Sequence, residues 1–563
     1  MVNRKKDLIY LFSFLGFLIL LNILSSFLFT RLDFTSEKRY TLSPITKDIL
    51  GKLEDNIQIT VYLEGDFPAS FKRLRNATRD ILADFKAYSN GNLSFNFVNP
   101  SSGDLKTREV TFQQLAGKGI EATNLSVKTE EGMSQKTIFP AALITYKGKQ
   151  IAVNLLQTRT GASPEEILNN SVQNLEYAFL SAVKKVSTGG KPRIGFTEGH
   201  GELSDLQLND AMKSLEDGYE VGRVNLSVIP LEGIEKLSVL IIPKPNTAFT
   251  EAEKFKIDYF VIRGGRILWA IDQVNAELDS LRGAGGQLAF PKKLNLDDIL
   301  FKYGVRINYN LVADMNCAQI PVSVGNVGGQ SQVQLLPWLF YPIFVATSSH
   351  PIVKNLDGLR SEFAGTIDTI PVKGISKKVL FSTSPFNRTL ETPTMLSLQM
   401  VEQEPDPKSF KNIPKPVAVL LEGKFTSSFK NRPVPTGINA EVKVIENAKF
   451  SKMIVFADGD ILKNQVNNAD GSPFPLGYDR YSQQQYGNKS FLLNAADYLT
   501  DDSGIIQLRN KEIKIRLLDR ARIRTEKTFW QFINIALPLI LLTLFGFSRH
   551  FYRLRKYARQ DQF

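Results

Sequence analysis

Two long apolar segments near the two ends of the chain constrain how everything between them can be arranged. The first runs from Leu8 to Phe29 and the second from Phe529 to Phe547. A helix needs roughly 20 apolar residues to cross a hydrocarbon core about 30 Å thick. We therefore expect transmembrane helices at residues 1–30 and 528–548. Two spans would place both ends of the chain on one side of a membrane and its whole interior on the other.

The residues that flank these segments favour membrane helices over the alternatives. A basic stretch at residues 4–6 precedes the first segment, as in a secretory signal. However, the apolar part is too long for such a signal and no small-x-small cleavage site follows, so we expect an uncleaved anchor. The second segment starts at Phe529 and Trp530 and is followed by basic and aromatic residues at 549–553. That collar is typical of a membrane interface rather than of a buried core helix.

Basic residues occur on both sides of each predicted span, so charge alone does not fix the orientation. Arg31, Lys38 and Arg39 follow the first span, the basic juxtamembrane segment 506–527 precedes the second, and the tail 549–563 is also basic. Long loops cross membranes largely regardless of charge, so the short terminal segments carry more weight. We expect both termini, including the tail 549–563, to lie in the cytoplasm and the main body to lie outside it.

The juxtamembrane segment 506–527 has two interpretations. Its basic residues favour a strip held at anionic lipid headgroups. The alternation of Ile513, Ile515 and Leu517 with Lys514 and Arg516 also fits a solvated strand face.

Composition narrows the classes of protein to which the interior can belong. The chain has 563 residues, 43% of them hydrophobic, which favours two packed domains. Its single cysteine, Cys317, excludes an internal disulfide and any Cys-x-x-Cys redox or zinc motif. The net charge of +12 is modest, and the interior lacks a clustered basic face with interleaved aromatics. We therefore expect no nucleic-acid partner and no cofactor.

The first interior region, residues 31–188, has the pattern of a small α/β domain. Ile57–Leu63 and Leu93–Val98 have strand composition and flank a helical stretch at Phe71–Tyr88, which predicts a parallel pair with a right-handed crossover. A hairpin is predicted from strands at Ala141–Tyr146 and Gln150–Leu155, and a helix is predicted after Ser163. This order resembles a thioredoxin-like fold. Without redox cysteines, such a domain would serve for binding or spacing.

The second region, residues 189–505, alternates strands and helices and predicts a doubly wound parallel sheet. The predicted strands are Arg193–Thr197, Tyr219–Leu226, Val239–Pro243, Arg266–Ile271, Lys378–Ser382, Val417–Leu421 and Met453–Ala457. Helices are predicted at Leu206–Leu215 and after Thr250, which forms a capping box with Glu253. An insertion at about residues 275–375 is rich in Gly, Val and Pro, and we expect it to be irregular with flexible loops.

Polar residues at the ends of the predicted strands form the candidate ligand or partner site. They are Glu198, His200, Glu202, Asp272, Asp458 and Asp460. If the sheet brings these strand ends together, they would form an acidic pocket with one histidine, suited to a cation, an amine or a sugar. Carboxylates at strand ends also commonly cap the following helices. We favour capping over a metal or catalytic site, because His200 alone offers nitrogen ligation.

The sequence lacks the motifs that would make the chain a motor or a hydrolase. No Gly-x-x-x-x-Gly-Lys-Ser/Thr phosphate loop occurs, and no Gly-x-Ser-x-Gly elbow is present. Cys317 lies in the stretch expected to be irregular, not on a strand-to-helix turn with a histidine partner. We therefore expect that the protein is not an enzyme.

Several motifs together support a family resemblance that covers essentially the whole chain. They are the Gly199–Glu202 stretch (GHGE), Gly264–Gly265, Asp458–Asp460 and Asn494–Leu499, set between the two end segments. The chain resembles the gliding-motility-associated ABC transporter auxiliary component GldG of Bacteroidetes. The resemblance implies an ABC permease and a separate ATPase as partners, and a link to gliding motility and protein secretion. It also implies a bacterial inner-membrane protein whose main body lies in the periplasm. It also implies that the second region is similar to glutamine-amidotransferase-like sheets.

Two hypotheses for function remain open at this point. The preferred one is a non-catalytic, membrane-anchored accessory subunit of an ABC transporter whose periplasmic domain binds cargo or partner proteins. The alternative is a periplasmic enzyme or solute-binding protein that acts on a glycan or peptide through the acidic strand-end pocket.

Overall fold

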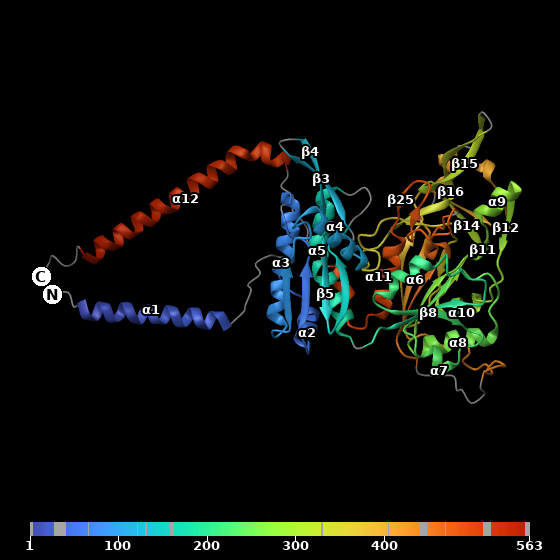
Figure 1. The fold of residues 1–563 in the computed structure, drawn as a ribbon, viewed down its shortest axis with the longest axis horizontal. Helices are drawn as coiled ribbons and strands as arrows, with labels where there is room; N and C mark the ends of the chain where they lie inside the picture. Colours follow the sequence, from blue (N-terminus) through green and yellow to red (C-terminus); the bar gives the residue numbers. More distant parts are fainter. Residues whose placement is uncertain are drawn as a thin grey trace. The chain divides into compact units, whose positions relative to one another are not determined.

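A computed structural model describes most of the chain (Figure 1). The described residues are 4–27, 41–65, 67–120, 122–129, 132–157, 163–188, 190–327, 330–402, 405–411, 413–438, 448–467, 469–510 and 520–557. The chain divides into two units, Met1–Lys511 and Glu512–Phe563.

The two end segments form helices, but only one of them meets the requirements for a membrane span. Helix α12 (Arg520–Tyr557) contains an apolar stretch, Arg524–Arg555, that is long enough to cross a membrane and is exposed along its length. Helix α1 (Arg4–Phe27) contains a shorter apolar stretch, Ile9–Asn22. We expected two membrane-spanning helices, but within the described residues only α12 is long and apolar enough to be one. The predictions for Arg31, Lys38, Arg39 and residues 511–519 and 558–563 lie outside the described part of the chain.

The first region contains a four-stranded sheet in the order β2-β1-β5-β6. Strand β1 pairs parallel with β2 and antiparallel with β5, and β5 pairs antiparallel with β6. The predicted parallel crossover, hairpin and final helix are thus confirmed, whereas α4 and the β3–β4 hairpin were not predicted. The elements are α2 (Pro44–Gly51), β1 (Ile57–Val61), α3 (Ala69–Tyr88), β2 (Leu93–Phe97), α4 (Leu105–Gly117), β3 (Thr123–Thr129), β4 (Gly132–Ile138), β5 (Ala141–Tyr146), β6 (Lys149–Asn154) and α5 (Pro164–Ser187).

The core of the first region includes residues from far along the chain. Helices α3 and α5 pack through Phe85 and Phe179, whose rings meet edge to face with centroids 6.5 Å apart. The hydroxyl of Ser163 accepts a hydrogen bond from the Glu166 amide, which confirms the predicted cap of α5. The same core also contains Ile505 and two neighbours from the 3-10 helix η4 (Ile505–Asn510). The first region is therefore completed by the end of the second.

The second region contains a ten-stranded sheet in which β15-β16-β19-β22-β23-β10-β9-β7-β8 are neighbours and β17 pairs with β16. Strands β8, β7, β9, β10 and β23 run parallel, but β22, β19, β16 and β15 pair antiparallel. The expectation of a wholly parallel sheet was therefore wrong. Parallel neighbours need a long crossover, usually through a helix, and no α-helix lies between β19 and β23 among the described residues.

The seven predicted strands of this sheet have bounds close to the predicted ranges, whereas β15, β16 and β17 were not predicted. The strands of the sheet are β7 (Arg193–Glu198), β8 (Glu220–Asn225), β9 (Val239–Pro243), β10 (Arg266–Ala270), β15 (Cys317–Val327), β16 (Gln330–Ala346), β17 (Leu359–Arg360), β19 (Ile375–Ser382), β22 (Pro416–Gly423) and β23 (Ser451–Phe456). The helices of this region are α6 (Asn209–Glu216), α7 (Leu231–Ile234), α8 (Glu251–Ile262), α9 (Leu278–Ala284), α10 (Asp297–Tyr303) and α11 (Asn488–Thr500). The capping box of Thr250 and Glu253 at the start of α8 is confirmed.

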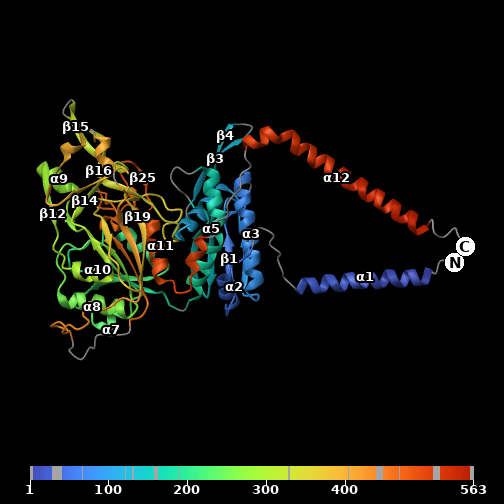
Figure 2. The same ribbon diagram turned by 180° about the vertical axis from the view of Figure 1, so that it is seen from behind.

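The insertion at residues 275–375 is not irregular, as we had expected, but mostly β-structure. Its largest element is the β15–β16 hairpin, and Cys317 is the first residue of β15. Aromatic residues of β16, among them Trp338 and Phe340, are buried in a core cluster of their own. Figures 1 and 2 show this hairpin projecting at the end of the large sheet. Residues 325–332 lie at the end of this hairpin, and residues 328–329 lie outside the described part of the chain.

Short elements complete the second region. They are β11 (Val274–Asn275), β12 (Gly286–Pro291), β13 (Val305–Ile307), β14 (Asn310–Asp314), β18 (Ile367–Thr369), β20 (Asn387–Glu391), β21 (Thr394–Ser397), β24 (Tyr478–Asp479), β25 (Gln484–Gln485), and the 3-10 helices η1 (Leu398–Val401), η2 (Pro407–Phe410) and η3 (Asp460–Leu462).

Gly265, which precedes β10, is expected to tolerate no side chain. A Cβ atom there would lie 2.3 Å from the ring of Phe260, which is 1% exposed. Because the ring is held in a packed core, we expect Gly265→Ala to lower the free energy of unfolding by about 1–3 kcal/mol. Urea denaturation measures the change. Gly222→Ala in β8 is the matched control, since no atom lies within 4 Å of a Cβ there, and an equal loss in both variants would contradict the argument.

Candidate functional site

The five parallel strands bring the predicted site residues to one edge of the large sheet. In space their order is β8-β7-β9-β10-β23, so the chain reverses its direction of winding between β7 and β9. Ligands of open α/β sheets bind at the carboxyl ends of strands beside such a reversal. The carboxyl ends of β7, β9, β10 and β23 all lie at this edge of the sheet. The predicted site residues lie at or just after these strand ends together with Lys244, and Glu253 lies nearby.

His200 lies in a buried clamp between two glutamates. Its Nε2 is 3.1 Å from Glu253 Oε2, its Nδ1 is 3.5 Å from Glu202 Oε1, and its ring stacks on Phe249 with centroids 3.9 Å apart. Although burial disfavours the charged ring, the adjacent carboxylates of Glu202 and Glu253, which attract the charged ring and can accept its N–H groups, hold the pKa of His200 above its usual value of 6.5. Since all three charged side chains are 8% exposed or less, the clamp stabilises the turn after β7 and offers no open ligand site.

The clamp predicts a specific pH dependence of stability. Because the folded pKa of His200 is raised, its contribution is fully present below pH 6.5 and is lost as the pH rises through the folded value. The pKa values of Glu202 and Glu253 are lowered despite burial, so their contribution is present above pH 4.5 and is lost at lower pH. We expect His200→Gln to destabilise the protein most between these two pH values, measured by urea denaturation at several pH values.

His350 provides the control for this experiment. Burial lowers the pKa of His350 to about 4, so this ring is neutral near pH 6. The destabilisation caused by His350→Gln should therefore not shrink above pH 6.5. A constant effect of His200→Gln from pH 5 to pH 9 would contradict a charged clamp.

Glu198 lies apart from both buried groups. Its carboxylate is 44% exposed and is 3.4 Å from Arg223 Nε. The six predicted residues thus form no single pocket: Glu198 is on the rim, His200 and Glu202 are in the clamp, and the three aspartates form a second group.

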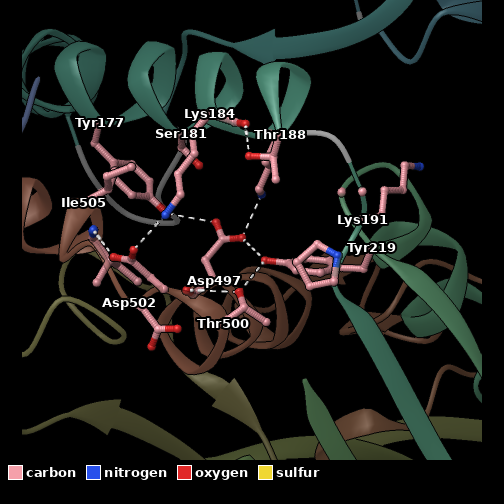
Figure 3. A pocket seen from close by; sticks show the side chains of 16 residues that line it. Tyr177, Ser181, Lys184, Thr188, Lys191, Tyr219, Asp497, Thr500, Asp502 and Ile505 are labelled. Carbon is pink, nitrogen blue, oxygen red and sulfur yellow. Dashed lines mark hydrogen bonds and ion pairs between the residues drawn. The ribbon is translucent and has the colours of Figure 1, made fainter. Parts of the chain in front are cut away.

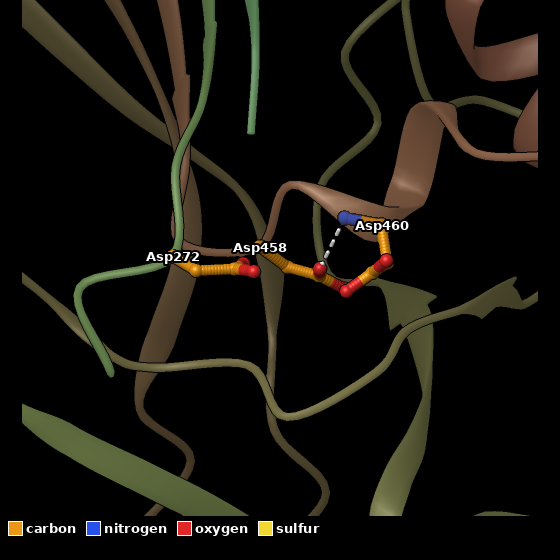
Figure 4. A group of neighbouring side chains, drawn as sticks. All are labelled: Asp272, Asp458 and Asp460. Atoms are coloured by element: carbon orange, nitrogen blue, oxygen red, sulfur yellow. Dashed lines mark hydrogen bonds between the residues drawn. The ribbon is translucent and has the colours of Figure 1, made fainter. Parts of the chain in front are cut away.

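The three aspartates surround part of a buried lysine that the sequence analysis did not identify. Carboxylate oxygens of Asp272, Asp458 and Asp460 lie within 4.8 Å of one another (Figure 4). The Nζ atom of Lys244 is 2.6 Å from Asp460 Oδ2, 3.4 Å from Asp272 Oδ2 and 2.7 Å from Glu277 Oε1. The side chains of Lys244, Asp272 and Asp460 are all 4% exposed or less, so the charges compensate one another away from water.

Backbone amides fix the orientation of the carboxylates. The Gly459 amide donates to Asp272 Oδ1 at 2.6 Å, and the Asp460 amide donates to Asp458 Oδ1 at 2.6 Å. Lys244 has a φ of +56°, and a Cβ on Gly459 would lie 2.4 Å from the Lys244 side chain. Glycine at 459 is therefore required for the lysine to approach the strand end of β23.

The charges of this cluster are strongly coupled. Although burial disfavours its ammonium, Asp460, Asp272 and Glu277 hold the pKa of Lys244 well above its usual value. Lys244 and Lys463 hold the pKa of Asp460 below its usual range, also against the effect of burial. Burial, together with Asp460 and Asp272, raises the pKa of Asp458 well above its usual value. The ammonium therefore supplies the positive charge that a metal ion would otherwise bring to the aspartates.

A polar cavity of about 210 Å³ adjoins this cluster. Arg360 and Glu362 line it and form an ion pair at 2.6 Å, and the Arg360 guanidinium stacks on Tyr341 at 4.8 Å from the ring centroid. Gln319 and Ile320 of β15 form part of the wall. The inserted hairpin thus contributes directly to the cavity at the carboxyl edge.

A second cavity, of about 240 Å³, lies between α5 of the first region and α11 of the second (Figure 3). Asp497 is its central charged group: its carboxylate accepts hydrogen bonds from the hydroxyls of Tyr177 at 2.9 Å and Tyr219 at 2.5 Å, and is 2.7 Å from Lys185 Nζ. Although burial disfavours its charge, Lys185 and the tyrosines hold the pKa of Asp497 below its usual value. Asp497 therefore links the two regions.

A family model described as an ABC-type uncharacterized transport system matches residues 191–495, more than half of the chain. The chain belongs to this ABC-type transport family. A second model, described as a domain of unknown function (DUF7088), matches residues 36–145.

The relatives of this ABC-transport family member add little about its chemistry. A protein of Borreliella burgdorferi described as uncharacterized is 21% identical over 555 residues, covering 97% of this chain and 96% of that protein. Among solved structures, an mmIFT52 N-terminal domain has a TM-score of 0.32 and 13% identity, covering 55% of this chain and 98% of that one. A protein described as ThuA-like, from Bacteroides uniformis, has a TM-score of 0.28 and 14% identity, covering 56% and 94%. Scores this low do not establish a shared fold.

The ABC-transport family region contains both charged clusters and the cavity beside them, since all lie within residues 191–495. It also contains Cys317, whose pKa is raised to about 11 by burial and by Asp314, so little thiolate forms at neutral pH. The cavity beside Arg360, with its charged lining, can bind and orient a polar ligand or a partner side chain. The sequence analysis did not include Lys244 and Glu253 among the candidate site residues. Lys244 is basic and so did not fit the pattern of acidic strand ends, although it directly follows the last residue of β9. Glu253 was assigned only to the capping box of α8.

Proposed function

We propose that this auxiliary component of an ABC-type transport system is a non-catalytic, membrane-anchored subunit whose body binds cargo or partner proteins in the periplasm. Membership of the ABC-type transport family supports the association with a transporter. The sequence has no phosphate-binding loop, so a separate ATPase subunit and a permease would supply the motor and the path.

The observation that carries the non-catalytic part of the proposal is the position of Lys244. Its ammonium contacts Asp460, Asp272 and Glu277, and so satisfies the carboxylates that could otherwise act as a metal site or an acid–base pair. A buried cluster whose carboxylates are held by Lys244 and Lys463 stiffens the edge of the sheet. Catalysis would instead require a group with a free lone pair or a free proton directed at a substrate.

Membrane anchoring is proposed at both ends of the chain. Helix α12 is long and apolar enough to cross a membrane. Helix α1 would join it if its span continues beyond the described apolar stretch, as the sequence between Leu8 and Phe29 suggests. We further propose that the body lies in the periplasm, that the first region is thioredoxin-like and the second amidotransferase-like, and that the protein is linked to gliding motility and secretion. The sequence pattern and the resemblance to the gliding-motility ABC auxiliary component support these proposals.

Copurification tests the association with a transporter. The full chain, tagged at its C-terminus, would be extracted from its own membranes in a mild detergent, and the coeluting proteins identified by mass spectrometry. We expect a permease and an ATPase subunit to elute with it at constant ratio. Elution without a permease, after extraction and after chemical crosslinking in intact cells, would contradict the proposal.

The cavity beside Arg360 favours one alternative, a solute-binding protein or enzyme that acts on a glycan or peptide. Replacing Arg282 by Gln and Gln319 by Ala alters the cavity lining while leaving the clamp of His200 and the contacts of Lys244 intact. If the doubly substituted chain still associates with the permease and supports transport in cells, the alternative fails. If association persists but transport is lost, the result supports the alternative, in which the cavity binds the solute or substrate.

A further inference from the structure

A cavity of about 450 Å³ lies in the first region, remote in sequence from the charged edge of the large sheet. It opens where β1 and β2 end, and four aromatic side chains line it together with polar residues: Tyr62, Phe67, Phe112 and Phe139. Phe112 and Phe139 contact each other with ring centroids 4.7 Å apart. The family model that matches residues 36–145 has no assigned function.

Arg108 of α4 supplies positive charge to this aromatic cavity. Its Nε atom is buried and has no hydrogen-bond partner among the described residues. The nearest acid along the helix, Asp104, is engaged as the cap of α4, where it accepts a hydrogen bond from the Thr107 amide at 2.9 Å. A buried guanidinium N–H without an acceptor is costly, because the group cannot lose its proton.

The other charged residue of the lining does not neutralise Arg108. Glu64 lies 2.9 Å from Arg75 Nη1 and 3.2 Å from Arg79 Nη2, so its charge is already compensated. Arg108 is thus the one cation in the described lining, and none of its side-chain hydrogen bonds is taken up by Glu64.

These features select a ligand with one negative charge and an apolar body. A carboxylate matches the planar fork of a guanidinium with two parallel hydrogen bonds. The aromatic walls would hold an apolar or aromatic group beside it. A doubly charged phosphate would leave charge uncompensated here, since Arg108 is the single cation in the described lining.

We propose that the cavity beside Arg108 binds a monocarboxylate attached to an apolar or aromatic group, as found at the C-terminal residue of a polypeptide or in a small aromatic acid. Arg108 pairs with the carboxylate, and the rings of Phe112 and Phe139 contact the apolar group. This site is separate from the large sheet and does not depend on the function proposed for it.

Titration of the full chain in detergent with matched acids and amides tests the proposal. N-acetyl-L-phenylalanine and its amide serve as the small probes, and a peptide ending in Phe, as free acid or amide, serves as the polypeptide probe. We expect at least one acid to bind, by calorimetry, about tenfold or more tightly than its amide. Binding of the peptide acid identifies a chain terminus as the source, and binding of the small acid alone identifies a free metabolite.

Variants of α4 assign the contact. Arg108→Gln should remove the preference for acid over amide, and Arg108→Lys should retain part of it. Lys106→Gln, an exposed position on the same helix, should bind as the native chain does. Retention of the full preference for acid over amide in Arg108→Gln would overturn the proposal.

Binding measurements on the native chain alone also test the proposal, even if the variants do not fold. Equal binding of acid and amide, or no binding of either acid at millimolar concentration, would overturn the proposal.

Discussion

Replacing Lys244 by Met is expected to lower the free energy of unfolding by about 3–5 kcal/mol, because it leaves buried carboxylates without their cation. The side chain is 4% exposed and contacts Asp460 and Asp272, which are equally buried. Methionine keeps much of the volume of the side chain, so the loss reports charge rather than a cavity. Urea denaturation of the full chain in detergent measures it.

Lys213→Met on an exposed face of α6 is the matched control, with an expected change within about 0.5 kcal/mol. A similar small effect at Lys244 would show that the aspartates are not held as anions by the lysine.

Lys244→Gly tests the same cluster in a second way. Glycine accepts the φ of +56° at this position and vacates the space among the carboxylates. We expect millimolar Ca²⁺ or Mn²⁺ to raise the melting temperature of this variant and to leave that of the native chain unchanged, because oxygen ligands suit these cations.

Asp497→Ala is expected to destabilise the joint between the two regions by about 3–5 kcal/mol. The substitution removes the acceptor of two tyrosine hydroxyls and leaves the Lys185 ammonium unpaired near the cavity of Figure 3. Limited proteolysis should then cleave more readily in the segment between α5 and β7, in addition to the lower midpoint of urea denaturation.

Two further variants serve as comparisons for Asp497→Ala. Asp502→Ala removes a carboxylate that is 73% exposed, and its surface pair with Arg266 should contribute less than about 1 kcal/mol. Asp497→Asn can still accept one tyrosine hydrogen bond and should fall between the native chain and Asp497→Ala. Equal proteolysis of all four proteins would mean that Asp497 does not hold the regions together.

Local signals in the sequence predicted individual elements well. The strands at Val239–Pro243 and Ala141–Tyr146 have the predicted bounds. Both are short apolar runs bounded by polar or turn residues, which limit their extent directly. The capping box at Thr250 was likewise predictable, because its two partners are only three residues apart.

Pairing direction and charge partners could not be predicted in the same way. Strands β19 and β22 look like parallel strands in composition, but the connections around them allow antiparallel pairing. Lys244 and Asp460 are 216 residues apart, and His200 and Glu253 are 53 residues apart, so no local pattern reveals them. The sequence therefore predicted the strand ends correctly, but it placed all six side chains in one pocket. In the structure they lie in three separate places: the exposed rim, the clamp of His200 and the aspartate group. Their role in binding remains a prediction.

The packing of η4 into the core of the first region has a consequence for how the chain is made. Ile505, Ile506 and Leu508 fill part of a core whose other members precede residue 188. On the ribosome, that core must wait for roughly 320 more residues, or on the order of tens of seconds at about 5–20 residues per second. The domain that is synthesised first is thus among the last to be finished, and fragments cut after α5 should be poor substitutes for the whole protein.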